Sequence, residues 1–285
     1  MNAKKTALAA FFILTSAFAH AELKLETYQA DQGSFNVTST LITGEKEAVL
    51  IDSGFTRADA LRIAAKILDS GKTLTTIFIS QADPDYYFGV ETLKAQFPQA
   101  KVVTTPAVLQ KIEAKLPKKV AFWSPKMGEN APKHPVLPEA LTDNRLTLEG
   151  DTIEIKGTEG LLAHRPYVWI PSLKAITGNI AVFGKMHVWT ADSQSKAERK
   201  AWIKQLDEMK ALKPKVVIAG HSATVRQDVS NIDFTKSYLQ QFEQNLAQSK
   251  NSADLIQKMQ KAYPNLPATS NLELGAQVAT GEMKW

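Results

Sequence analysis

Strand-like and helix-like stretches alternate along this chain, and that alternation restricts the fold more than any other feature. The apolar run 48–51 reads Ala-Val-Leu-Ile, whereas 58–68 places apolar residues at helical spacing. The same patterns predict strands at 23–29, 35–43, 48–51, 75–80, 101–104, 145–148, 152–156, 167–170, 175–177 and 216–219. They predict helices at 58–68, 90–97, 106–116, 196–212, 234–249 and 253–262. Strands and helices in two successive batches indicate an α/β sandwich with mixed sheets.

Residues 117–144 interrupt this pattern. Prolines at 117, 125, 132, 135 and 138 surround Phe122 and Trp123, which predicts a long irregular loop over the surface. A loop of this length is often a lid or a binding loop, and the alternative is an insertion without a function. We therefore expect 117–144 to cover a cleft, within a domain that spans 22–232. Residues 233–285 are expected to form a helical extension packed on that domain.

The first 21 residues have the pattern of a secretory signal peptide. Lys4 and Lys5 precede an apolar stretch of 13 residues, and Ala19-His20-Ala21 is a small-residue cleavage site. The apolar stretch is short for a membrane span, which needs about 20 residues. We expect cleavage after Ala21, a periplasmic or secreted protein, and no membrane span in the mature chain.

Composition excludes several classes of function. The absence of cysteine rules out a disulfide scaffold, a thiolate nucleophile and cysteine-ligated zinc. Removal of residues 1–21 takes away two lysines and lowers the formal net charge from +5 to +3. This weak positive charge predicts no nucleic-acid partner, so the expected partner is a small molecule.

Polar residues gather directly after three predicted strands. The first group is 80–89, Ser-Gln-Ala-Asp-Pro-Asp-Tyr-Tyr-Phe-Gly; the second is 177–179, Thr-Gly-Asn; the third is 219–221, Ala-Gly-His. Loops that follow strand ends are where α/β folds collect their chemistry. These three groups are therefore the expected site.

The order and spacing of these segments resemble the metallo-β-lactamase superfamily over about residues 23–225. The segment 49–54 (Val-Leu-Ile-Asp-Ser-Gly) is similar to that superfamily's LIDTG segment, and 80–89 occupies the place of its H-x-H-x-D-H-x-G-G loop. Residues 169–171 with 177–179 are similar to its Y-I-P…T-G-D, and 220–221 to its late P-G-H. The resemblance implies a four-layer αβ/βα sandwich of two mixed β-sheets, here with extra C-terminal helices.

The metal-ligand positions of the resemblance are largely changed. By position, the superfamily's histidines fall on Gln81, Asp83, Tyr86 and Leu161, and its bridging aspartate falls on Asn179. Only Asp85 and His221 match the superfamily's residues. A branch with a D-P-D loop and a segment like 187–192 is the most similar. Because zinc favours imidazole and thiolate, a dinuclear zinc site is not expected.

The remaining oxygen donors suit a harder ion. We predict one divalent metal (zinc, manganese or iron) with ligands drawn from Gln81, Asp83, Asp85, His164, Asn179 and His221. The alternatives are an N-cap and turn at 83–85, a hydrogen-bonded loop histidine at 221, and structural roles for His164 and His187. Candidate substrate contacts are Tyr86, Tyr87, Arg165, His187 and Trp189.

Two hypotheses of function follow. In the first, the protein is an exported hydrolase in which one metal activates water for attack on an ester, amide, lactone or phosphoester, with Asp83 or Asp85 as general base. In the second, it is a non-catalytic ligand-binding protein that keeps the fold. We expect a monomer or a homodimer, since the apolar stripe of 234–246 can pack on the domain or on a second copy.

Overall fold

The computed structural model describes residues 22–224 and 226–285, so the predicted signal peptide lies outside the described residues. Its first sheet has six strands in sequence order, with β1 to β3 antiparallel and β3 to β6 parallel. The strands are β1 (Lys24–Gln29), β2 (Thr38–Thr43), β3 (Glu47–Ile51), β4 (Thr73–Ile79), β5 (Lys101–Thr104) and β6 (Glu139–Ala140).

The second sheet has five strands in the order β12-β10-β9-β8-β7, antiparallel except for the β10–β12 pair. These are β7 (Arg145–Leu148), β8 (Asp151–Lys156), β9 (Tyr167–Ile170), β10 (Ala175–Thr177) and β12 (Val216–Val217). A separate parallel pair joins β11 (Phe183–Gly184) to β13 (His221–Ser222), which places His221 beside Phe183.

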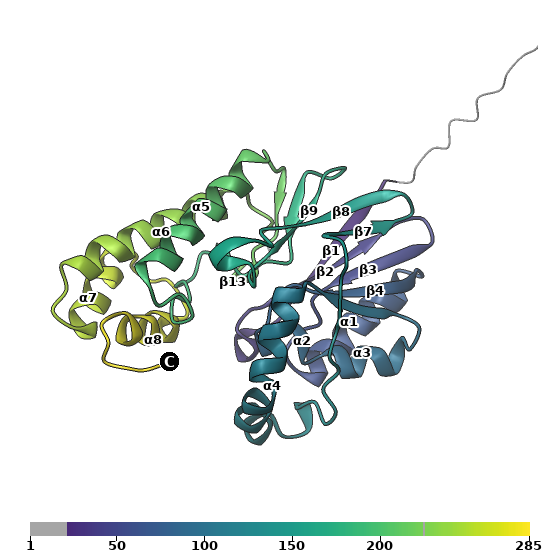
Figure 1. The fold of residues 1–285 in the computed structure, drawn as a ribbon, viewed down its shortest axis with the longest axis horizontal. Helices are drawn as coiled ribbons and strands as arrows, with labels where there is room; N and C mark the ends of the chain where they lie inside the picture. The colour runs from purple at the N-terminus through teal and green to yellow at the C-terminus, as the bar shows by residue number, and fades with distance from the viewer. Residues whose placement is uncertain (1–21, 225) are drawn as a thin grey trace, which may run out of the picture.

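The two sheets face each other across an apolar core. Ile42, Val49, Phe78, Val168 and Ile170 are among its buried members, and they come from both sheets. On β3 the neighbouring residues Ala48 and Leu50 point the other way, into the core under the N-terminal helices. Each sheet therefore has one face against the other sheet and one face against helices, and the predicted four-layer sandwich is confirmed (Figure 1).

Helices cover the two outer faces. On the side of the first sheet lie α1 (Arg57–Asp69), α2 (Pro84–Tyr87), α3 (Val90–Gln96) and α4 (Pro106–Met127). On the other side lie α5 (Lys196–Ala211), α6 (Ser230–Ala247), α7 (Ser252–Ala262) and α8 (Thr269–Ala279). Short 3₁₀ segments occur at Gln32–Ser34, Gly128–Asn130 and Gly160–Leu162. Helix α8 is absent from the sequence prediction, and α6 begins before the expected domain boundary at 233.

The prediction of an irregular segment from residue 117 is wrong for its first part, because α4 continues to Met127. Pro117 and Pro125 lie inside this helix. The side chains of Leu116, Val120, Trp123 and Met127 recur at helical spacing and pack on the N-terminal core. This packing offsets the cost of the interior prolines, which is about 3 kcal/mol each.

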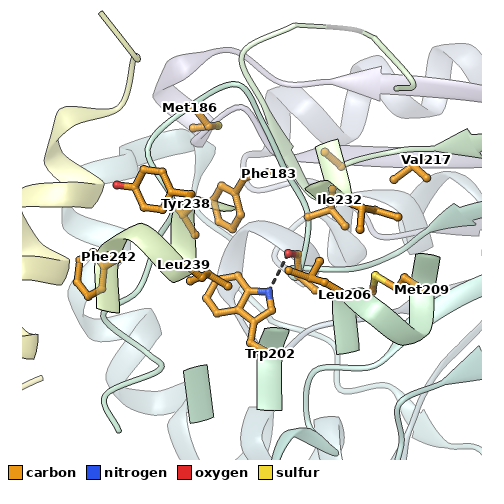
Figure 2. Packing of buried hydrophobic residues seen from close by; sticks show 14 of the residues in the cluster. Phe183, Met186, Trp202, Leu206, Met209, Val217, Ile232, Tyr238, Leu239 and Phe242 are labelled. Carbon is orange, nitrogen blue, oxygen red and sulfur yellow. Dashed lines mark hydrogen bonds between the residues drawn. The ribbon is translucent and has the colours of Figure 1, made fainter. Parts of the chain in front are cut away.

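The C-terminal helices have their own apolar core against the second sheet. Its buried members include Trp202 from α5, Phe183 from β11 and Tyr238, Leu239 and Phe242 from α6 (Figure 2). The Trp202 indole Nε1 donates a hydrogen bond to the Ala181 carbonyl at 2.8 Å. Across residues 22–224 and 226–285, no helix is both long and apolar enough to cross a membrane.

Candidate functional site

A cleft of about 1390 Å³ separates α4 from the segment that leads into α5. Four lysines of α4 line one wall: Lys111, Lys115, Lys118 and Lys119, called here the lysine face. The opposite wall includes Trp189, Asp192, Glu198 and Trp285. Asp83, Asp85 and His221 lie in the same cleft. Together with Trp189, four of the residues that the sequence singled out therefore line this cleft.

Asp85 and His221 face each other at the ends of strands from different sheets. Asp85 is in α2, just after β4, and His221 opens β13. The Asp85 Oδ2 lies 3.6 Å from the His221 Nε2. His221 Nδ1 lies 3.0 Å from the Phe35 carbonyl oxygen, which can only accept, so Nδ1 carries the hydrogen. The Nε2 lone pair is thus directed toward the carboxyl group.

Burial governs the charge state of this pair. It lowers the pKa of His221 to about 4, so the imidazole is neutral at pH 7. Burial, together with the nearby charge of Asp83, raises the pKa of Asp85 well above its ordinary value. With Asp85 protonated and His221 neutral, the pair lies in the cleft without net charge.

Asp83 directly precedes α2, and an N-cap role was the alternative to metal binding for this residue. Its backbone occupies the N-cap position, but its side chain makes no capping hydrogen bond. Instead its Oδ1 lies 3.9 Å from the Lys119 Nζ on the lysine face. The Asp83 carboxylate thus faces the cleft and interacts with α4.

Three other predicted ligands do not line the cleft. The Gln81 Nε2 donates to the Pro166 carbonyl at 2.9 Å. The Asn179 Nδ2 donates to the Ile218 carbonyl, and its Oδ1 accepts from the Val182 N–H. These two side chains hold loops together and are not among the cleft-lining residues. His164 is also outside the lining, and burial lowers its pKa to about 4.

Several predicted substrate contacts lie elsewhere. Tyr86 is buried behind the site and donates to the Asn179 carbonyl at 3.2 Å, while Tyr87 packs in the N-terminal core. The His187 Nδ1 lies 2.9 Å from the Tyr238 hydroxyl, within the C-terminal half. These positions correct the expectation of direct contact, since the direction of each side chain depends on packing that the sequence does not show. Trp189 does line the cleft.

Arg165 is buried close to this region without being part of the lining. Its guanidinium carbon lies 4.5 Å from the centre of the Trp202 ring, and its Nη1 donates to the Ser193 hydroxyl. Burial raises the pKa of Asp83, and the positive charge of Arg165 opposes this effect. Burial also acts to raise the pKa of Asp192, but hydrogen bonds from two indoles and the charge of Arg165 hold it below its ordinary value. Arg165 therefore contributes to the potential around the cleft through its charge.

The lysine face, Asp192 and Trp285 line the cleft but are not among the residues predicted from the sequence. The indole N–H groups of Trp189 and Trp285 donate to the two oxygens of the Asp192 carboxylate, at 2.6 and 3.0 Å. Lys111, Lys115 and Lys118 have the spacing of one helix face. That face was not predicted, because the helix was expected to end at residue 116, before Lys118. Asp192 and Trp285 are 93 residues apart, so no local pattern relates them.

The small size of Gly220 is necessary for the placement of His221. A Cβ atom at residue 220 would overlap the carbonyl oxygen of Asn179 and approach the Tyr86 hydroxyl. We expect Gly220→Ala to lower the free energy of unfolding by about 2 kcal/mol, as overpacking in a tight interior does. Urea denaturation measures this loss, and a wild-type free energy would contradict the contact.

The donor set does not fit the metal centre that the resemblance implies. Within the described part of the chain, no group of three or more His, Asp or Glu side chains is arranged to hold a metal ion. Asp85 and His221 face each other, but Gln81 and Asn179 are directed to backbone groups, and Leu161 supplies no donor.

Comparisons with known proteins agree with this architecture. Residues 33–169 match the family model described as the metallo-β-lactamase superfamily. A metallo-β-lactamase family protein from Thermus thermophilus is similar in structure, with a TM-score of 0.64, 17% identity, and 91% of each chain covered. The DIM-1 metallo-β-lactamase gives a TM-score of 0.55 at 18% identity, covering 77% of this chain and 93% of its own. The IND-7 enzyme gives 0.54 at 15% identity, covering 77% and 94%. At these identities the likeness shows the fold alone, and no curated protein matches the chain in sequence.

Proposed function

We propose that this chain, which belongs to the metallo-β-lactamase superfamily, binds a small molecule in its cleft without the superfamily's dinuclear metal centre. One observation carries this proposal. The residues at three ligand positions, Gln81, Tyr86 and Asn179, direct their polar atoms to backbone groups of the protein. The cleft remains large and is lined by aromatic and charged side chains, which suits a ligand site.

A hydrolase with one metal ion is the second candidate, and the Asp85–His221 pair favours it. The 3.6 Å separation and the free Nε2 lone pair provide two of the donors that one ion needs. Asp83 is the nearest further carboxylate in the cleft, where it interacts with Lys119. In this alternative the substrate would be an ester, amide, lactone or phosphoester.

We also propose that the protein is exported to the periplasm or secreted. The basic start, the short apolar stretch and the Ala-His-Ala sequence of residues 1–21 support this proposal.

Metal content separates the two candidates. We expect the purified mature protein to contain no stoichiometric metal after incubation with zinc, manganese or iron(II) and removal of free ions. Plasma mass spectrometry measures this content. One equivalent of metal that is lost in Asp85→Ala and His221→Ala would overturn the metal-free proposal and support the hydrolase. Asp69→Ala, an exposed position of α1, is the control for a lost carboxylate.

A further inference from the structure

We propose that the cleft binds an organic anion with an apolar body, whose anionic group contacts the lysine face of α4. This proposal rests on the proposed function, because it names the class of ligand for the same cleft. Two independent features of the lining support it. Exposed apolar side chains gather in the cleft, and most of its lysines have no carboxylate partner within the described residues, whereas its carboxylates do have partners there.

Exposed apolar side chains concentrate in the cleft. Eight large hydrophobic side chains of the described residues are exposed, and four of them line this one cavity. These four are Phe35, Phe122, Leu161 and Trp285, with exposed fractions of 39%, 56%, 55% and 52%. Apolar surface in a concave site favours a ligand that covers it. The ligand should therefore present an aromatic or aliphatic body to these side chains.

The carboxylates of the cleft already have partners within the protein. Asp85 faces His221, and Asp83 faces Lys119. The Asp192 carboxylate accepts from two indole N–H groups. Glu198 accepts from the backbone N–H and the hydroxyl of Ser195, both at 2.8 Å, at the start of α5. Asp85 is held in its neutral form beside His221, and the carboxylates of Asp83, Asp192 and Glu198 are stabilised by these contacts, which leaves little attraction for a cationic ligand.

Most of the cationic side chains that line the cleft, in contrast, have no carboxylate partner within the described residues. Lys111, Lys115 and Lys118 have no carboxylate within 4.0 Å among residues 22–224 and 226–285. Arg165 is 6% exposed, and its Nη2 is buried without a hydrogen-bond partner in the same part of the chain. Because Arg165 is not a lining residue, it adds positive charge near the cleft and is not counted as a contact for the ligand. The unpartnered charge around the cleft is therefore positive, which selects an anion.

A matched pair of fluorescent probes tests this proposal on the full mature chain. 8-Anilinonaphthalene-1-sulfonate is an aromatic anion, and N-phenyl-1-naphthylamine has the same rings without the sulfonate. We expect one site for each probe, with tighter binding of the sulfonate. Its affinity should fall as salt is added, because the lysines are exposed.

Two triple variants locate the anion. Lys111→Gln, Lys115→Gln and Lys118→Gln together should weaken sulfonate binding about tenfold and leave the neutral probe unchanged. The matched control replaces Lys200, Lys204 and Lys210 with glutamine, on exposed positions of α5 outside the lining.

Phe122→Ala should weaken the binding of both probes, since the exposed Phe122 ring is expected to contact the apolar body of each probe. Unchanged binding of the neutral probe also verifies that each lysine variant is folded.

The results of these binding experiments test the anionic ligand class separately from small-molecule binding in the cleft, the function on which it rests. If both probes bind equally well and the α4 triple variant behaves like its control, the anionic class is wrong and ligand binding stands. If equal losses occur in the two triple variants, the effect is a general one of net charge, and the lysine face is not the site. If neither probe binds at one site sensitive to Phe122→Ala, the cleft is not a small-molecule site and the proposed function fails with it.

Discussion

Trp202→Ala is expected to lower the free energy of unfolding by about 4 kcal/mol, the range measured for large aromatic side chains removed from a core. The Trp202 ring is 1% exposed and lies among Phe183, Leu206 and Leu239 (Figure 2). Its removal leaves a cavity, frees the Ala181 carbonyl and removes the ring beneath the Arg165 guanidinium. Urea denaturation followed by circular dichroism measures the loss.

Two further variants separate the contributions of Trp202. Trp202→Phe keeps most of the ring but loses the indole N–H, so it should cost about 1 to 2 kcal/mol. Trp285→Ala makes the same deletion at a half-exposed position and should cost less than about 1 kcal/mol. A loss of under about 1 kcal/mol for Trp202→Ala would show that this cluster does not hold the C-terminal half together.

Asp52→Asn is expected to remove a large pH dependence of stability. Asp52 is buried between the ends of β3 and β4, where its oxygens accept hydrogen bonds from the Ser80 N–H and Ser80 hydroxyl, both at 2.7 Å. Burial raises the pKa of Asp52 from 3.8 to about 7, against the opposing effect of these two hydrogen bonds. The folded protein thus holds this proton more tightly than the unfolded chain.

The direction of the effect follows from proton binding. Between about pH 4 and pH 7 the unfolded chain releases the Asp52 proton first, so the free energy of unfolding falls as the pH rises. A shift of about 3 pKa units corresponds to a loss on the order of 4 kcal/mol across this window. Asparagine cannot ionise, can keep both contacts with Ser80, and tolerates the positive φ of 63° at this position.

Urea denaturation at several pH values from 4 to 8 measures the difference. The free energy of unfolding of the wild type should fall with respect to that of Asp52→Asn as the pH rises. Asp69→Asn, the same change at an exposed position of α1, is the matched control. Parallel curves for wild type and Asp52→Asn would show that Asp52 does not titrate in this window.

The chain order of strands and helices could be predicted because it depends on local periodicity. The continuous run at β3 and the helical spacing in α1 are fixed by neighbouring residues, and both elements occur within one or two residues of their predicted bounds. The same reasoning failed at Pro117. Proline disfavours a helix locally, but Leu116, Val120 and Trp123 pack on the N-terminal core and keep α4 helical.

For the site too, some features could be predicted from local patterns and others depended on tertiary packing. Asp83, Asp85 and His221 are predicted from their places after strands, and the fold brings them into one cleft, where Asp85 and His221 from different sheets lie 3.6 Å apart. Tyr87 and His187 looked equally suitable in sequence, yet both point into apolar cores. Residue type and strand position set which backbone segments meet, but not the direction of each side chain.

The sequence by itself predicted the resemblance to the metallo-β-lactamase superfamily, the four-layer arrangement and the loss of most of that superfamily's metal-ligand residues, since these depend on patterns within short segments. Only the tertiary structure decided which replacements face the cleft. Gln81 and Asn179 were free to be ligands until the fold placed backbone groups within hydrogen-bond distance of their amides. The lysine face likewise becomes part of a candidate site only because the opposite wall of the cleft, formed by residues at least 70 positions later in the chain, lies across from it.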